Sequence, residues 1–183
     1  MINLGQTCVA PDYVLLDETV EKVFLEKLTH YIKVFYGEKP IESKDYGKIV
    51  NQKHFERLVN LFKNQHVYYG GDINQKLLKI GPTILTDVRT EDPIMQEEIF
   101  GPLLPILKYQ HLRDAINMIR SKPHPLALYL FSNNSHEVNE ILNQCQFGGG
   151  CINDTIMQVA SDYLPFGGVG DSGMGQYHGK ASF

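Results

Sequence analysis

The chain has 183 residues, a hydrophobic share of 43% and a net charge of −4 at neutral pH. Lys and Arg are scattered without excess, so the composition excludes the electrostatic footprint of a nucleic-acid-binding protein. A chain of this length buries roughly 70% of its unfolded surface, so we expect one compact domain over residues 1–183 whose core needs no metal or disulfide.

The first half predicts a strand followed by two helices. After a loop around Cys8, "DYVLL" is typical of a short strand, and residues 17–37 predict an amphipathic helix that Asp17 caps and Gly37 ends. A second helix is predicted over residues 51–64. The predicted apolar face of the first helix holds Val20, Val23, Phe24, Leu28, Tyr31 and Phe35, and that of the second holds Phe55, Leu58, Val59 and Phe62.

The second half alternates strands and helices. Strands are predicted within residues 66–71, 77–87, 103–109, 126–132 and 149–154, and helices within residues 111–123 and 135–145. The run "LALYLFS" at residues 126–132 is nearly all apolar, as expected for a strand buried on both faces. The alternation predicts an α/β fold, a three-layer αβα domain with a mostly parallel sheet.

Cys8 lies in "NLGQTCVAPDYVLL", on a loop that leads into the first strand. Gly5 permits a tight turn before it and Pro11 fixes the exit after it. A cysteine in this setting is either a small hydrophobe at the edge of the core or a nucleophile presented by a loop. The residues alone leave both interpretations open.

The stretch "MQEEIFGPLLPIL" places Glu97 and Glu98 just before Phe100. One interpretation is an acidic turn that precedes a strand. The other is a ligand site, because a carboxylate accepts hydrogen bonds from two ribose hydroxyls and an aromatic ring flanks a planar one.

Residues 168–173 match the G-x-G-x-x-G pattern of dinucleotide-binding loops. That pattern has meaning only between a strand and a helix, and no helical pattern follows here. We therefore reject a dinucleotide loop and expect glycines that allow a close backbone approach, with Phe166 projecting from the turn.

The remaining chemistry-bearing residues exclude further classes. The seven histidines show no metal-ligand spacing, and no G-x-S-x-G elbow indicates a serine hydrolase. Cys8, Cys145 and Cys151 form no CxxC pair, which favours a reducing, cytoplasmic location. No apolar run reaches the ~20 residues of a membrane span, and the N-terminus does not have the pattern of a secretory signal.

Four stretches in order, "NLGQTCVAPDYVL", "QEEIFGPLLPI", "CINDTI" and "LPFGGVGDSGMGQYHGKASF", resemble the aldehyde dehydrogenase superfamily, in its class 3 (fatty or aromatic aldehyde) branch. The resemblance implies that Cys8 is the catalytic nucleophile. It implies that Glu98 holds the nicotinamide ribose and that Phe100 packs beside the nicotinamide. It also places Phe166 in the aldehyde tunnel and Asn153 near the site in a positioning role.

The same resemblance implies oxidation of a small-molecule aldehyde to a carboxylic acid with NAD or NADP, and a homodimer as the full protein. In the family the general base, the second oxyanion donor and the Rossmann-like cofactor domain lie upstream of the cysteine. We therefore expect residues 1–183 to be a catalytic domain truncated at both ends, and inactive alone. The alternatives are a CoA-acylating or semialdehyde relative, or a non-catalytic domain with only thiol esterase-like reactivity.

Overall fold

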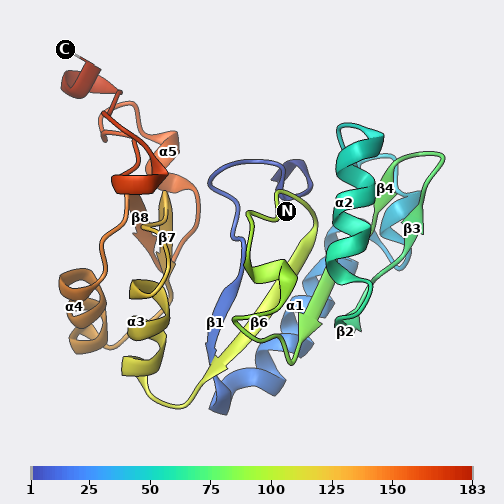
Figure 1. Ribbon diagram of the computed structural model, residues 1–183, viewed down its shortest axis with the longest axis horizontal. Coiled ribbons are helices and arrows are strands. Elements are labelled where there is room, and N and C mark those ends of the chain that lie inside the picture. The colour runs from blue at the N-terminus through green and yellow to red at the C-terminus, as the bar shows by residue number, and fades with distance from the viewer. Residues whose placement is uncertain (1, 183) are drawn as a thin grey trace. The chain divides into compact units, whose positions relative to one another are not determined.

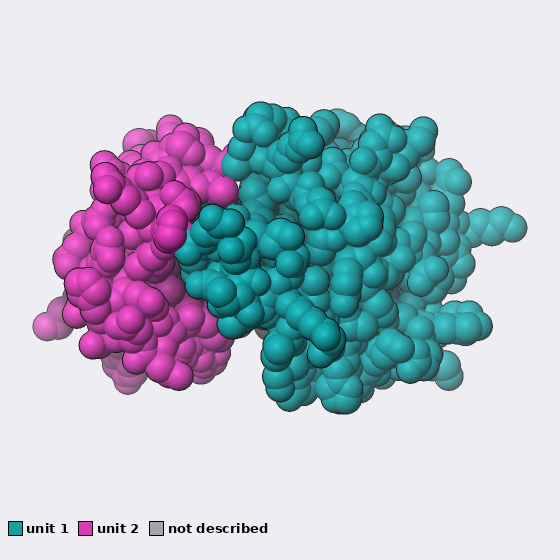
Figure 2. Space-filling view, turned by 90° about the horizontal axis from the view of Figure 1, so that it is seen from below, with its two compact units in different colours: residues 1–110 teal, residues 111–183 magenta. Residues whose placement is uncertain are grey.

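The computed structural model describes residues 2–182 and divides the chain into two compact units, Met1–Gln110 and His111–Phe183 (Figures 1 and 2). Two compact units of contacts do not by themselves make two independently folding domains. The single catalytic domain over residues 1–183 therefore stays a prediction.

A four-stranded sheet forms the first unit, and its strands lie where the sequence predicts them (Figure 1). The order across the sheet is β1 (Val14–Asp17), β6 (Leu103–Tyr109), β5 (Thr83–Thr86) and β2 (His66–Tyr69). β6 pairs in parallel with β1 and β5, whereas β2 pairs antiparallel with β5. A small antiparallel pair of strands, β3 (Ile73–Asn74) and β4 (Lys79–Ile80), comes between β2 and β5 in the sequence.

Helix α1 (Glu21–Tyr36) packs on this sheet. Asp17 acts as the predicted cap, because its carboxylate accepts from the Thr19 N–H at 2.8 Å, although a short 3-10 turn (Glu18–Val20) comes before the α-helix. Gly37 ends the helix with a φ of 80°, a value that favours glycine. The cluster between helix and sheet consists of Leu16, Leu25, Ile32, Ile84, Leu104 and Ile106.

The predicted buried face of α1 is largely wrong. Leu25 and Ile32 are 5% and 7% exposed, whereas Val23, Tyr31 and Phe35 are 53%, 53% and 71% exposed. Apolar residues cover more than half of the circumference of this helix, so the helical period allows two faces. Packing against the sheet selects the face that carries Leu25 and Ile32.

Helix α2 (Gln52–Phe62) follows its prediction more closely. The Asn51 side chain caps it by accepting from the His54 N–H at 2.9 Å. The buried residues are Phe55, Leu58, Leu61 and Phe62, while Val59 is half-buried.

The second unit has a two-stranded parallel sheet, β7 (Ala127–Leu130) with β8 (Gly149–Ile152). Ile116, Ile141 and Cys145 form its buried cluster. β7 is half-buried along its whole length, which corrects the expectation of burial on both faces. Within residues 2–182, β8 is the only strand that pairs with β7. Its helices are α3 (Leu112–Arg120), α4 (Ser135–Gln144) and α5 (Met157–Ala160).

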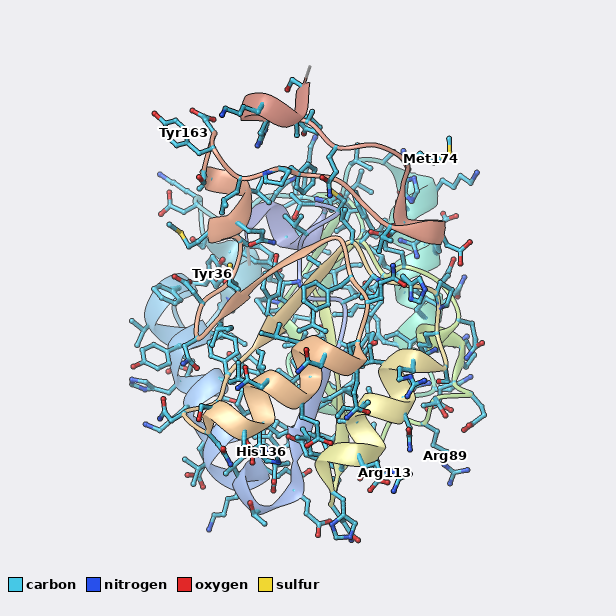
Figure 3. All side chains as sticks on the ribbon, turned by 90° about the vertical axis from the view of Figure 1, so that its left-hand side faces the viewer. Tyr36, Arg89, Arg113, His136, Tyr163 and Met174 are labelled. Carbon is cyan, nitrogen blue, oxygen red and sulfur yellow. The ribbon has the colours of Figure 1, made fainter. Side chains whose placement is uncertain are left out.

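The glycine-rich end of the second unit has no dinucleotide loop. A 3-10 turn, Gly170–Ser172, lies within the pattern, and in residues 2–182 no α-helix follows it. A Cβ on Gly168 would lie 2.1 Å from the Ser172 carbonyl oxygen, so this glycine allows a close backbone approach as predicted. Tyr163 and Met174 lie nearby in the chain and point outward, at 91% and 99% exposure (Figure 3).

Other 3-10 turns are Ile2–Gly5, Pro40–Glu42, Pro93–Met95 and Gly179–Ser182. In residues 2–182, none of the helices has the length and apolar character that crossing a membrane requires.

Leu85 tests the central sheet, because it is 0% exposed on β5 between β2 and β6. We expect Leu85→Ala to lower the free energy of unfolding by about 2–5 kcal/mol, the usual cost of a buried Leu→Ala cavity. Urea denaturation measures the change. Leu77→Ala, at a side chain that is 54% exposed, is the matched control and should cost much less. Equal costs would contradict the core assignment.

Candidate active site

The Cys8 loop begins with an unusual left-handed turn. Asn3, Leu4 and Gly5 have φ values of 49°, 56° and 73° in succession. This conformation costs roughly 1–2 kcal/mol at each non-glycine residue. Burial of the Leu4 side chain, which is 5% exposed, helps to hold it.

Cys8 itself is exposed, so the structure rejects the interpretation of a buried, inert thiol. Its neighbour Val9 is 8% exposed and anchors the loop, and the Ala10 N–H donates to the Thr7 carbonyl at 3.1 Å. Among residues 2–182 the Cys8 backbone N–H has no hydrogen-bond acceptor. The loop therefore offers a thiol and a free backbone donor from the same residue.

Residues 97–101 form a second loop that leads into β6. Ile99 is 1% exposed, and this inward anchor leaves Glu98 and Phe100 on the outside. Phe100 has a φ of 52° and a ring that is 41% exposed. The Glu98 carboxylate has no hydrogen-bond or ion-pair partner within the described residues. Both side chains are thus available to a ligand.

The two loops touch through two glycines. A Cβ on Gly5 would lie 2.4 Å from the Gly101 carbonyl oxygen, and a Cβ on Gly101 would lie 2.5 Å from a methyl carbon of Leu58. Real Cβ atoms do not approach other atoms so closely. This contact brings the loops of Cys8 and of Glu98 and Phe100 together at the amino ends of the parallel strands β1 and β6.

Asp12 connects the loops by hydrogen bonds. Its carboxylate accepts from the Ile99 N–H at 2.8 Å and also from the Phe100 N–H. Burial raises the pKa of Asp12 from 3.8 to about 6, with a smaller upward contribution from the Glu98 carboxylate, while the two backbone donors oppose the rise.

Arg57, on α2, donates hydrogen bonds to the backbone carbonyl groups of the same loop. Its guanidinium donates to the Ile99 carbonyl at 2.5 Å and to the Glu98 carbonyl at 3.3 Å, and forms an ion pair with Glu97 at 3.4 Å. Asp12 and Arg57 therefore bind the donors and the acceptors of one short stretch of backbone. We call this arrangement the Asp12–Arg57 clamp.

The second unit carries the other two predicted site residues. Asn153, at the carboxyl end of β8, forms two hydrogen bonds with the backbone of Ser132. The Ser132 N–H donates to the Asn153 side-chain oxygen at 3.0 Å, and the Asn153 side-chain nitrogen donates to the Ser132 carbonyl at 3.1 Å. Phe166 is half-buried, and its ring meets Tyr177 edge-on at 5.5 Å. Cys8, Glu98 and Phe100 thus share the first unit, and Asn153 and Phe166 lie in the second.

No group of three or more His, Cys, Asp or Glu side chains with the arrangement of a metal site occurs in residues 2–182. The sequence interpretation missed Asp12 and Arg57. Asp12 carried a weak signal, since it lies four residues after Cys8, at the first position of the predicted strand. Arg57 carried none, because an arginine in a polar helix position has the pattern of a solvent-exposed side chain.

The raised pKa of Asp12 gives a stability test. Between about pH 4 and pH 6 the folded chain holds a proton that the unfolded chain has released, so the free energy of unfolding falls as pH rises through this window. The fall is at most about 3 kcal/mol, at about 1.4 kcal/mol per pKa unit. Asp12→Asn should remove this slope in urea denaturation, and Asp72→Asn, at an exposed carboxylate, should keep it. Equal slopes in all three proteins would refute the assignment.

Arg57→Ala should loosen the loop that Arg57 holds. Two carbonyls lose a charged donor, so we expect a loss of roughly 1–3 kcal/mol in unfolding free energy. Amide hydrogen exchange at Ile99 and Phe100 should accelerate. Arg57→Lys should recover little, because an ammonium lacks the planar fork. Arg89→Ala, at an arginine that points outward (Figure 3), is the control, and exchange no faster in Arg57→Ala than in that control would contradict the clamp.

Comparison with known proteins identifies the family of the chain. The model of the aldehyde dehydrogenase family matches residues 1–183. The chain is 49% identical over 182 residues to the dimeric NADP-preferring aldehyde dehydrogenase of Rattus norvegicus, covering 100% of this chain and 40% of that protein. It is 50% identical over 183 residues to the 4,4'-diaponeurosporen-aldehyde dehydrogenase of Staphylococcus aureus, covering 99% and 40%.

A solved structure described as the substrate-bound state of Staphylococcus aureus AldH matches with a TM-score of 0.96 at 49% identity, over 99% of this chain and 40% of that one. The fold is therefore shared, which confirms the predicted α/β class. The chain spans about 40% of the length of these relatives. The chain belongs to the aldehyde dehydrogenase family.

Proposed function

We propose that the protein is an NAD(P)-dependent aldehyde dehydrogenase that oxidises aldehydes to carboxylic acids through Cys8. One observation carries the proposal: the exposed thiol loop touches, through Gly5 and Gly101, the clamped loop that presents Glu98 and Phe100. The names of the relatives, which include NADP-preferring aldehyde dehydrogenases, support it.

The chemistry of the chain's own residues begins with the Cys8 thiolate. Its sulfur attacks the aldehyde carbonyl carbon and forms a thiohemiacetal, and the carbonyl oxygen takes the negative charge. The Cys8 N–H, which has no acceptor among residues 2–182, is placed to donate to such an oxyanion. Water then displaces the thiolate from the later thioester and yields the carboxylic acid.

Glu98 and Phe100 fit a nicotinamide cofactor. The free Glu98 carboxylate is suited to accept hydrogen bonds from two ribose hydroxyls, and the exposed Phe100 ring is suited to flank a planar ring. When bound, NAD or NADP supplies the hydride acceptor that turns the thiohemiacetal into a thioester. The Asp12–Arg57 clamp holds the backbone of residues 98–100 and thereby fixes the positions from which the Glu98 and Phe100 side chains project.

Further parts of the proposal rest on the family resemblance. The general base and second oxyanion donor are expected upstream of the thiol, so residues 1–183 alone should not turn over aldehyde. A homodimer is supported by the word "dimeric" in the names of relatives, and light scattering of the purified protein tests it. A cytoplasmic location is proposed from the unpaired cysteines, and cell fractionation tests that.

The test uses the protein that the full open reading frame encodes. Cys8→Ala should lower aldehyde-dependent NAD(P)H formation by about 10³-fold or more, because the covalent route is lost. Glu98→Gln should lower it less while the protein stays folded. Lys76→Ala, at an exposed lysine far along the chain from both loops, should leave it unchanged.

Product analysis separates the competing functions. A carboxylic acid formed with NAD(P)H supports the proposal. An acyl-CoA product formed only with CoA indicates a CoA-acylating enzyme, and ester turnover that needs Cys8 but ignores the nucleotide indicates residual hydrolase chemistry. Full activity in Cys8→Ala would refute the proposed nucleophile.

A further inference from the structure

The Gln6 side chain helps to hold the left-handed turn before Cys8. The Gln6 N–H and its side-chain nitrogen donate to the Asn3 carbonyl at 3.0 and 3.2 Å, and the Asn3 side-chain nitrogen donates to the Gln6 carbonyl at 3.1 Å. These bonds close the turn that contains the strained residues Asn3 and Leu4. Strained backbone persists where its surroundings over-determine it.

The same amide ties the turn to another segment. Its nitrogen donates to the Lys48 carbonyl at 3.1 Å, and its oxygen accepts from the Val50 N–H at 2.9 Å. That segment is itself fixed, because Ile49 is 0% exposed and its N–H donates to the Leu78 carbonyl at 2.8 Å. The Gln6 amide therefore pairs with the backbone on both sides of Ile49, as a neighbouring strand would.

We propose that Gln6 is a positioning residue for Cys8. Gln6 sets the direction of the Cys8 thiol and of the Cys8 N–H. Gln6 lies two residues before Cys8, and the described hydrogen bonds give no direct partner to Cys8 itself. The inference rests on the proposed function, because it assigns Gln6 to the orientation of the proposed nucleophile.

An amide is required at this position because it offers a donor and an acceptor on one planar group. Gln6→Glu keeps the shape and the acceptor for Val50 but loses the donor to Asn3 and Lys48, and it places a carboxylate against two carbonyl oxygens. Gln6→Ala removes all three side-chain bonds. The two variants therefore separate loss of the donor from loss of the whole contact.

The experiment compares two reactions of Cys8 in the protein that the full open reading frame encodes. Iodoacetamide alkylation requires only an exposed thiolate. In acylation by p-nitrophenyl acetate the thiolate attacks the acetyl carbon and p-nitrophenolate leaves, and this reaction also requires a donor for the oxyanion. Peptide mass spectrometry assigns both adducts to Cys8, and Cys8→Ser gives the background. Each variant is assayed well below its own melting temperature and across neutral to alkaline pH.

We expect Gln6→Glu and Gln6→Ala to lower the acylation rate by at least about tenfold, since a ~1 Å misplacement costs on the order of 10²-fold. The alkylation rate should change by less than about threefold, because the thiol stays exposed. Gln52→Ala loses only a hydrogen bond from the Gln52 side-chain amide to Glu56 within α2. It is the matched control and should change neither rate.

Three results overturn the inference. If the wild type acylates Cys8 and both variants do so equally fast, Gln6 has no positioning role and the proposed nucleophile stands. If acylation and alkylation fall together with the melting temperature, the role of Gln6 is only structural. If the wild-type protein of the full open reading frame forms no acyl adduct at Cys8, both this inference and the proposed nucleophile fail.

Discussion

The candidate site depends on a short stretch of backbone that is bound from both sides. The Asp12 carboxylate accepts hydrogen bonds from the N–H groups of Ile99 and Phe100, and the Arg57 guanidinium donates to the carbonyls of Glu98 and Ile99. The opposite charges match the opposite ends of the peptide dipoles. Ligand-facing side chains need such support, because a loop whose backbone groups were satisfied only by water would not hold them in one place.

The position of this site relative to the sheet is unusual. Ligands of open parallel sheets commonly bind at the carboxyl ends of the strands, but the loops of Cys8 and Phe100 precede β1 and β6. The carboxyl ends carry polar contacts near the surface instead: the Lys108 ammonium pairs with the Glu21 carboxylate at 3.1 Å, and a His66 ring nitrogen lies 3.3 Å from an Asp87 carboxylate oxygen. Surface pairs of this kind contribute little to stability, so the two ends of the sheet differ in role as well as composition.

Local patterns were enough to predict most of the fold. β6 occupies residues 103–109, the range that its apolar run predicts. Gly37 ends α1 because the end of the helix needs a positive φ, which glycine adopts readily. The buried face of α1 was not predictable, since apolar residues on two sides of one helix satisfy the same period. Burial of β7 depends on how many strands pair beside it, which is a tertiary property that its own sequence does not contain.

The site shows the same division between local and distant information. Cys8, Glu98 and Phe100 lie in recognisable stretches, but what joins them comes from pairs far apart in the chain. Gly5 is useful because Gly101 occupies the space that a Cβ would need, and Gly101 in turn is confined by Leu58 on α2. A larger residue at Gly5 would push the two loops apart, and one at Gly101 would clash with Leu58, even if the thiol and the carboxylate were unchanged. The distance between the reactive groups is therefore fixed by residues that have no reactive group of their own.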